Sequence, residues 1–242
     1  MAIGVIPVRY DSTRFPGKPL ALICDRPLVR WVYDGACQAA ALSEVLVATD
    51  DERIREAAEG FGARCVITGG SVRNGTERVA AAVAGLEADV VVNVQGDEAL
   101  ITGPQIDAAV RALQDDPGAS VATLAVAFDD DSRLDDPDAV KVVLDEQGRA
   151  LAFSRARVPL PSRPDAEPLL HVGVYVYRRA ALDKYTDLQQ TEAEQSERLE
   201  QLRFLEHGHG IRVVVIEAEP MFGVDSPEAI PEVERILRSR GA

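Results

Sequence analysis

The sequence predicts an α/β fold with a mostly parallel central sheet covered by helices. In the first half of the 242-residue chain, short apolar runs alternate with segments whose apolar residues recur at helical spacing. After residue 128 this alternation stops, and an acidic loop, two strands joined by a turn and a proline-rich loop follow. We therefore expect a single domain over residues 1–242, with a smaller mixed-sheet lobe over roughly 129–210.

The first half contains five apolar runs that are typical of buried strands. They are residues 2–8, 44–50, 63–68, 89–95 and 119–128. Helices are expected between and after them, over residues 27–42, 51–62, 75–86 and 104–115. Pro27 suits the first turn of the first helix, and Asp50 or Asp51 suits the N-cap of the second.

The sequence of the second half of the chain predicts strands that pair antiparallel. Residues 139–155 have strand–turn–strand character around Gln147 and Gly148, and residues 171–178 alternate as a strand does. The remaining elements are a charged helix, a strand and a C-terminal helix, over 191–208, 211–218 and 226–240. We expect Pro231 to kink the last of these helices.

Charge and cysteine content exclude several classes of protein. The net charge of −14 argues against nonspecific binding to nucleic acid, because affinity for phosphate comes mainly from Lys and Arg. There is no apolar run long enough to span a membrane and no signal-peptide pattern. Cys24, Cys37 and Cys65 are interpreted as reduced core thiols of a cytoplasmic protein. The acidic run 129–131 is interpreted as a solvated loop.

Cations gather directly after the first apolar run, although the chain as a whole is acidic. Arg9, Arg14 and Lys18 lie beside Gly17, at the expected carboxyl end of a strand, where open α/β sheets bind ligands. Gly17 allows close approach of the backbone, and successive amides here would form an anion nest. The spacing fits neither a P-loop nor a dinucleotide fingerprint, and an ordinary surface loop is the alternative.

A second glycine-bearing loop opens the helix expected at 75–86. It places Arg73 and Arg78 around the amides of a helix N-terminus, which favours an anion. Thr76 would serve equally well as a simple helix cap.

Two carboxylates are candidates for a metal site. Asp97 follows the apolar run 89–95 within Gln95-Gly96-Asp97-Glu98, and Mg²⁺ typically takes one or two carboxylates together with substrate phosphates. Asp225 precedes Ser226-Pro227, so each aspartate has an alternative interpretation as a turn or helix cap. Asp97 makes a metal role for Asp225 credible.

Four polar residues in the second half are less distinctive. His171 and Tyr175 fall on one face of an expected strand, together with Gly173. Such residues are more often structural than functional. Glu200 and Gln201 lie in the expected charged helix, where they would ordinarily be solvated.

Seven stretches in order resemble one family over nearly the whole chain. They are "IPVRYDSTRFPGKPL", "NGTERV", "VNVQGDEALI", "AVKVVLDEQGRALAFSR", "HVGVYVYR", "LEQLRFL" and "GVDSPEAI". The family is 3-deoxy-manno-octulosonate cytidylyltransferase, also called CMP-Kdo synthetase. The resemblance implies a Rossmann-like nucleotidyltransferase fold whose smaller lobe dimerises. It also implies transfer of CMP from CTP to the anomeric hydroxyl of Kdo, with Mg²⁺ as cofactor and release of pyrophosphate.

The resemblance also implies residue roles. Arg9 and Lys18 would bind the CTP triphosphate and act in catalysis with Asp97 and Asp225, the implied Mg²⁺ ligands. The implied nucleotide-binding residues are Arg9, Ser12, Arg14, Lys18, Arg73, Asn74, Gly75, Thr76, Arg78, Gln95, Gly96 and Asp97. The implied sugar-binding residues are Arg14, Gln95, Arg155, His171, Tyr175, Glu200 and Gln201.

The sequence departs from the family mainly on the acceptor side. The loop from Arg155 to His171 is short, "VPLP" replaces an Ile-Pro-Trp stretch, and Leu170 stands where a basic residue is usual. Arg155, Arg157 or Arg163 would have to replace that cation. Two alternatives to Kdo transfer therefore stay open: cytidylyl transfer to another acidic sugar such as 8-amino-Kdo, and a catalytically silent nucleotide-binding protein.

Overall fold

The computed structural model describes residues 1–11, 14–70, 72–128, 131–157, 168–217 and 223–241. It divides into two compact units, residues 1–107 with 221–242 and residues 108–220. The lobe expected over 129–210 falls within the second unit, which begins earlier in the chain. The acidic run 129–131 lies largely outside the described residues, and no helix in the described residues is long and apolar enough to cross a membrane.

The first unit is built on four parallel strands in the order β6-β1-β4-β5. Their bounds are β1 Ala2–Pro7, β4 Leu42–Thr49, β5 Arg64–Ile67 and β6 Val90–Val94. All five residues of β6 are buried, as expected for a valine-rich strand covered on both faces. Because the strands are parallel, the loops that follow them meet at one edge of the sheet, and this edge carries the candidate site.

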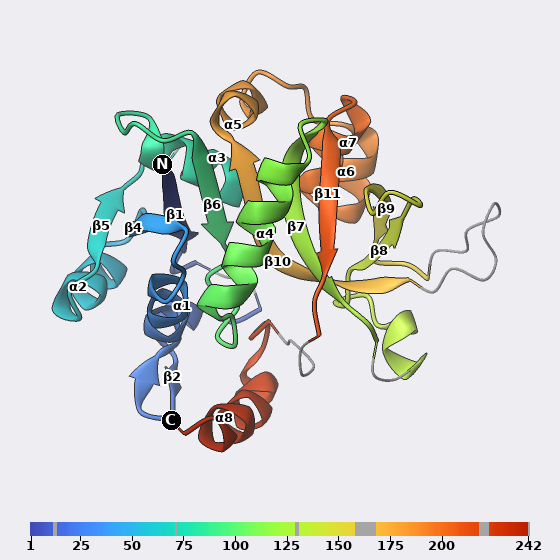
Figure 1. Ribbon diagram of the computed structural model, residues 1–242. Helices are drawn as coiled ribbons and strands as arrows, with labels where there is room; N and C mark the ends of the chain where they lie inside the picture. The colour runs from blue at the N-terminus through green and yellow to red at the C-terminus, as the bar shows by residue number, and fades with distance from the viewer. Residues whose placement is uncertain (12–13, 71, 129–130, 158–167, 218–222, 242) are drawn as a thin grey trace. The chain divides into compact units, whose positions relative to one another are not determined.

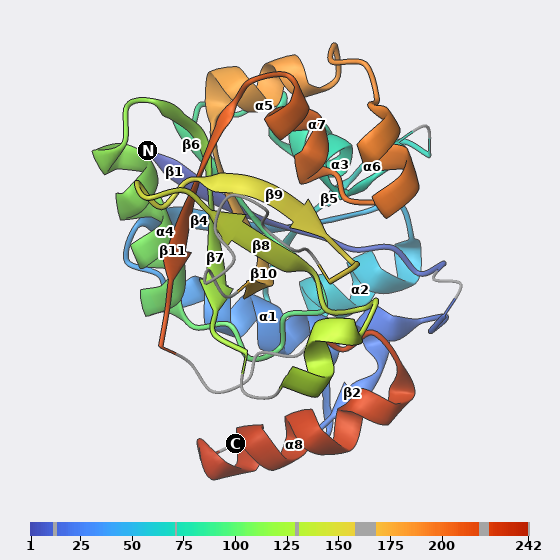
Figure 2. The ribbon, with the colours of Figure 1, turned by 90° about the vertical axis from the view of Figure 1, so that its right-hand side faces the viewer.

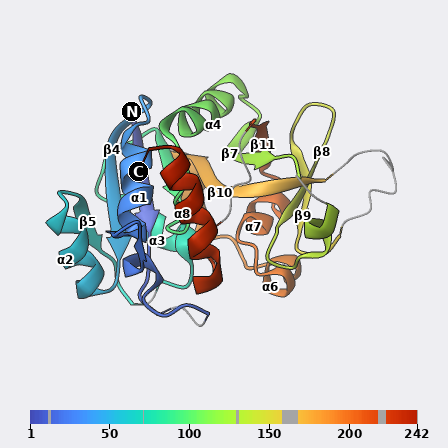
Figure 3. The same ribbon diagram turned by 90° about the horizontal axis from the view of Figure 1, so that it is seen from below.

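Helices cover both faces of these strands. They are α1 Leu28–Cys37, α2 Glu52–Gly60 and α3 Gly75–Val83. The unit also contains the short 3-10 helices η1 Lys18–Leu20 and η3 Pro227–Ala229, and α8 Ile230–Ser239, which packs against η3 and the short strand β2, Leu22–Ile23 (Figures 1 and 3). Helix α1 lies on one face and α3 on the other (Figures 1 and 2). Helix α4, Gly103–Asp115, contains the boundary between the units. A hairpin of β2, Leu22–Ile23, and β3, Arg26–Pro27, was not predicted.

The second unit has the mixed pairing that the sequence predicts. Its strands are β7 Ala119–Val126, β8 Lys141–Leu144, β9 Ala150–Ser154, β10 Leu169–Arg178 and β11 Gly210–Val215. β7 pairs in parallel with β11 and antiparallel with β10, which also pairs with the β8–β9 hairpin. The helices are α5 Arg179–Tyr185, α6 Glu192–Glu197, α7 Gln201–Glu206 and the 3-10 helix η2 Asp131–Asp135.

The structure corrects several predicted element boundaries. The charged helix expected over 191–208 is two helices, because Arg198 takes a left-handed φ of 56° that breaks the helical hydrogen-bond ladder. Pro231 lies in the first turn of α8 and does not kink it, since the lost N–H has no partner there anyway. The helix expected over 27–42 ends at Cys37.

The cysteines are free, but the prediction that they are core residues is wrong. Cys37 is exposed, and Cys24 and Cys65 are partly exposed. Helix α1 ends at Cys37, so its last turn projects beyond the buried face formed by Val29, Val32 and Ala36.

Candidate active site

Asp97 is positioned by a tight turn at the carboxyl end of β6. A Cβ atom on Gly96 would lie 2.2 Å from a methyl of Val8 and 3.3 Å from the carbonyl oxygen of Pro7, so only glycine fits between this turn and the end of β1. Within the turn, the amide of Glu98 donates to the carbonyl of Gln95 at 3.1 Å. The turn therefore presents the Asp97 side chain at the edge of the sheet.

The C-terminal segment brings Asp225 to the same place. The amide of Val224 donates to the main-chain carbonyl of Asp97 at 3.0 Å. A Cβ on Gly223 would lie 3.8 Å from the carboxyl carbon of Asp97 and 3.9 Å from a carboxylate oxygen of Asp225. Two aspartates that are far apart in the sequence thus form one carboxylate pair.

Lys18 bridges this pair. Its Nζ lies 2.8 Å from Oδ2 of Asp97 and 3.5 Å from Oδ1 of Asp225, and Arg14 contacts Oδ1 of Asp225 at 2.9 Å. We call Arg14, Lys18, Asp97 and Asp225 the carboxylate cluster. Burial disfavours the charged form of Lys18, but the charges and hydrogen bonds of both aspartates outweigh burial and raise its pKa.

Gly17 sets the position of Lys18. Its φ is +72°, and the ring of Tyr10 lies 3.2 Å from the site of a Cβ, so a side chain would be strained on both counts. The anion nest expected here is not formed. The amide of Gly17 donates to the main-chain carbonyl of Tyr10 at 2.9 Å, and the amide of Lys18 donates to that of Phe15 at 3.1 Å. Both amides are therefore used within the backbone.

Other predicted nucleotide-binding residues have structural partners. Asn74, not Thr76, caps α3, accepting a 2.8 Å hydrogen bond from the amide of Glu77, while Thr76 is buried. Arg73 forms a 2.5 Å ion pair with Glu77. Arg9 is exposed just beyond β1, and Ser12 lies outside the described residues.

Arg78 joins two strand ends. Arg78 is 5% exposed, and its guanidinium donates to the carboxylate of Asp50 at 2.7 Å and to the Thr68 hydroxyl at 2.5 Å. Neither partner was predicted. The residues that follow β4 and β5 nevertheless fall at the same sheet edge by topology, which is the signal that would have identified them.

In the second unit, His171 belongs to an aromatic cluster. Its ring centroid lies 5.1 Å from that of Tyr175 and 5.3 Å from that of Phe153, which confirms that His171 and Tyr175 share a face. The Thr123 hydroxyl donates to the carbonyl of Val174 at 2.6 Å, so it accepts from Nε2 of His171 at 2.9 Å. Desolvation of this partly buried ring lowers the His171 pKa to about 3, and the hydrogen bond to Thr123 makes it a neutral Nε2–H tautomer.

Glu200 and Gln201 begin α7, and a buried ion pair holds this helix to α6. Arg203 donates to both carboxylate oxygens of Glu194, at 2.7 and 2.6 Å, and its guanidinium stacks on Tyr185 at 4.2 Å. Gln201 is buried, which contradicts the solvated position expected of it. Its side-chain nitrogen has no hydrogen-bond partner among the described residues, so Gln201 is a buried donor suited to a polar ligand.

Arg155 is held by main-chain carbonyls. Its side chain donates to Glu197 and to Pro137, both at 2.9 Å, and the buried ammonium of Lys141 donates to its carbonyl at 2.7 Å. Arg155 therefore ties the C-terminal end of α6 and the loop before β8 to the end of β9. Of the other candidate cations, Arg157 lies 3.5 Å from Asp135. Arg163 and the "VPLP" stretch lie outside the described residues.

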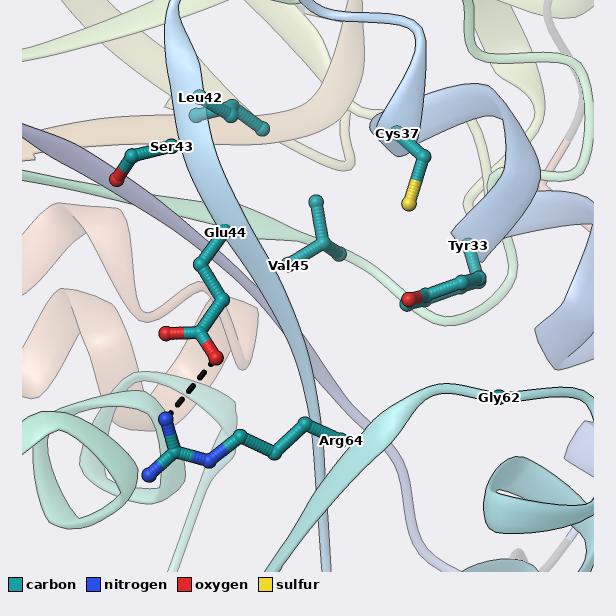
Figure 4. A pocket seen from close by; sticks show the side chains of 8 residues that line it. All are labelled: Tyr33, Cys37, Leu42, Ser43, Glu44, Val45, Gly62 and Arg64. Carbon is teal, nitrogen blue, oxygen red and sulfur yellow. Dashed lines mark hydrogen bonds and ion pairs between the residues drawn. The ribbon is translucent and has the colours of Figure 1, made fainter.

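A cavity of about 360 Å³ lies elsewhere in the first unit. Leu42 to Val45, at the start of β4, form part of its wall, so it is at the opposite end of that strand from the carboxylate cluster. Figure 4 shows the Cys37 thiol beside Tyr33 and the ion pair between Glu44 and Arg64. The nitrogen and oxygen of that pair lie 2.9 Å apart. Burial and Cys37 raise the pKa of Tyr33 to about 12. The cavity contains none of the predicted site residues.

The carboxylate cluster fits a divalent cation of the Mg²⁺ type. Among the described residues there is no group of three or more His, Cys, Asp or Glu side chains that would enclose a metal by itself. Asp97 and Asp225 instead offer two carboxylates, with the ammonium of Lys18 between them. Mg²⁺ commonly uses this donor set, completing its shell with water and substrate phosphate.

The chain is similar in sequence and fold to known cytidylyltransferases. The cytidylyltransferase family profile matches residues 3–213. The 3-deoxy-manno-octulosonate cytidylyltransferase of Solibacter usitatus is 44% identical over 239 residues, covering 98% of this chain and 94% of that protein. The mitochondrial 3-deoxy-manno-octulosonate cytidylyltransferase of Arabidopsis thaliana is 41% identical over 244 residues, covering 98% and 83%. A solved structure of CMP:2-keto-3-deoxy-manno-octonic acid synthetase complexed with CTP superposes with a TM-score of 0.90 at 39% identity, covering 99% of each chain.

Proposed function

This chain belongs to the 3-deoxy-manno-octulosonate cytidylyltransferase family, and we propose that it transfers CMP from CTP to Kdo. The observation that carries the proposal is the carboxylate cluster: Lys18 lies within 3.5 Å of both Asp97 and Asp225, at the strand edge where nucleotides bind. Cations and paired carboxylates together are what a triphosphate and its metal require. A protein that only bound nucleotide would not need both carboxylates.

The reaction is an in-line displacement. The anomeric oxygen of Kdo forms a bond to the α-phosphorus of CTP, the bond from that phosphorus to the bridging oxygen of pyrophosphate breaks, and the hydroxyl proton leaves to solvent. Pyrophosphate departs with the bonding electrons. Negative charge grows on the leaving group, so positioning and fixed positive charge supply most of the rate enhancement.

Asp97 and Asp225 would hold Mg²⁺. When bound, the ion would offset phosphate charge and favour loss of the acceptor hydroxyl proton. Lys18, Arg9 and Arg14 would bind the triphosphate, with Arg14 also within reach of an acceptor carboxylate by resemblance. The net charge of −14 repels both substrates, so these cations must overcome that field locally.

The acceptor-binding side of the proposal rests on the second unit. His171, a neutral imidazole, and Gln201, a buried amide donor, are suited to sugar hydroxyls rather than to a carboxylate. Tyr175 stands beside His171, and Glu200 precedes Gln201 at the start of α7. We further propose that two copies of the chain pair through this unit. Three free cysteines support the cytoplasm as its compartment.

The experiment is pyrophosphate release from CTP in the presence of Mg²⁺, with and without Kdo. We expect release that depends on Kdo and on the metal, and a preference for CTP over UTP, ATP and GTP. 8-Amino-Kdo and related 2-keto-3-deoxy acids are run at the same CTP concentration to identify the preferred acceptor. Kdo-independent release, or equal use of ATP, would reject the proposal.

A further inference from the structure

Lys18 occupies the space that the proposed function gives to the metal. Its ammonium lies between the carboxylates of Asp97 and Asp225, at 2.8 and 3.5 Å, and its side chain is 17% exposed. In the proposed function the same side chain binds phosphate. An ammonium that contacts both carboxylates, as it does here, has to change partners before it can bind phosphate.

The use of lysine here is itself informative. The chain has 26 basic residues, but only Lys18, Lys141 and Lys184 are lysines. An arginine fork would hold a carboxylate through two fixed hydrogen bonds, whereas an ammonium is a compact point charge on a flexible stem. Lysine is therefore the side chain that can hold two carboxylates and then release them.

We propose that Lys18 is a resident counter-ion, which keeps the divalent metal from binding at Asp97 and Asp225 until a nucleotide triphosphate arrives. This inference rests on the proposed function. Without nucleotide, a divalent ion would enter a site whose carboxylates are already paired with cations, and the Lys18 ammonium between them would repel it. A triphosphate gives the ammonium a new anionic partner, which frees both carboxylates for the metal.

Arg14 does not fill the same role. Its guanidinium contacts Asp225 at 2.9 Å, and its side chain is 51% exposed, against 17% for Lys18. A pair as exposed as this is strongly screened and restrains its partner weakly. Lys18 is thus the residue of the cluster that decides when the metal binds.

The test measures Mn²⁺ binding by electron paramagnetic resonance without nucleotide, in the wild type, Lys18→Met and Lys184→Met. The control, Lys184→Met, also removes one positive charge, but from an exposed position on α5. We expect Lys18→Met to bind Mn²⁺ roughly tenfold more tightly than the wild type, because a cation adjacent to the site is gone. Lys184→Met should match the wild type, and Lys18→Met/Asp97→Asn should lose the added affinity. Equal affinity of Lys18→Met and wild type would overturn the inference.

A second measurement uses the wild type and does not depend on how a variant folds. With three lysines, a carbon–proton spectrum of lysine Cε groups contains three signals, and the spectra of Lys18→Met and Lys184→Met identify the Lys18 and Lys184 signals. We expect CTP with Mg²⁺ to move the Lys18 signal and the same concentration of Mg²⁺ alone to leave it in place. If Mg²⁺ alone moves that signal as far, Lys18 does not exclude the metal.

These outcomes are separate from those of the proposed function. Neither Mn²⁺ binding without nucleotide nor the Lys18 signal requires turnover or Kdo. If pyrophosphate release is Kdo-dependent but Lys18→Met gains no Mn²⁺ affinity, the enzyme assignment stands and only the counter-ion role fails. If no acceptor supports pyrophosphate release but Lys18→Met gains Mn²⁺ affinity, the counter-ion role stands and the enzyme assignment fails.

Discussion

Two ion pairs, one in each unit, use the same chemistry in opposite surroundings. Lys18 and Asp97 are 17% and 20% exposed, and the pair shares its charges with Asp225. Arg203 and Glu194 are 2% and 3% exposed, and two parallel hydrogen bonds lock them together. A sealed bidentate pair cannot exchange partners without exposing a bare charge, whereas a partly open lysine pair can. The Arg203–Glu194 pair therefore suits a permanent structural role, and the Lys18–Asp97 pair suits a site that must admit ligands.

The largest expected effect comes from breaking the sealed pair. Glu194→Ala leaves the Arg203 guanidinium buried without its carboxylate, so the free energy of unfolding should fall by about 3–5 kcal/mol, measured by urea denaturation. The matched control is Glu194→Met/Arg203→Met, which removes both charges and should be destabilised less than the single variant. A single variant with wild-type stability would show that the pair is not a brace.

The next effect comes from the open pair and should appear in catalysis. Asp97→Asn and Asp225→Asn each remove a proposed metal ligand, and kcat should fall roughly a hundredfold or more, measured by pyrophosphate release at saturating Mg²⁺. The urea midpoint should change little, because both side chains are partly exposed. Near-normal turnover in either variant would remove that residue from the set of essential ligands.

Titration of His171 sharpens the comparison in the second unit. Its pKa is about 3 in the folded chain, against the ordinary 6.5, so the unfolded state binds more protons between these values. The contribution of neutral His171 to the free energy of unfolding is fully present above pH 6.5 and is lost as pH falls toward 3. The free energy of unfolding then falls by up to about 1.4 kcal/mol per pH unit. His171→Gln should therefore lose less stability than the wild type between pH 6.5 and 5, by urea denaturation. Identical pH slopes would mean that His171 is protonated or accessible.

The smallest effect tests how Lys18 is positioned. Gly17→Ala places a side chain at φ +72° against the Tyr10 ring and should cost about 1–2 kcal/mol of stability. It should also lower kcat/KM for CTP, because η1 begins at Lys18. Gly85→Ala is the control, since a Cβ there meets nothing within 4 Å. If both variants behave alike, the left-handed turn does not position the cluster.

Sequence patterns predicted the units of local structure well and their boundaries less well. The valine-rich run ending at Val94 and the cap at Asp51 follow from burial and side-chain hydrogen bonding, which are local. The break at Arg198 was missed because the residues on both sides of it favour a helix. The Arg203–Glu194 pair was missed because it joins the two helices on either side of that break.

Site residues divide in the same way. Asp97, Asp225 and Lys18 were recognisable because each follows or precedes a distinctive local pattern, and the structure brings them together. The partners of Arg78 and Arg155 were not recognisable, because Asp50, Thr68 and Glu197 belong to other segments of the chain.

The sequence by itself determined the α/β class, the caps and the residue types from which a metal and triphosphate site is made. These depend on hydrophobic period and on hydrogen bonds between near neighbours. Only the tertiary structure decided that Lys18 lies between Asp97 and Asp225 and that the amides beside Gly17 are used by the backbone. The physical reason is that parallel strands and the returning C-terminal segment set distances between residues that no local pattern encodes. Whether a charge is a brace or an exchangeable contact depends on those distances and on the solvent left around them.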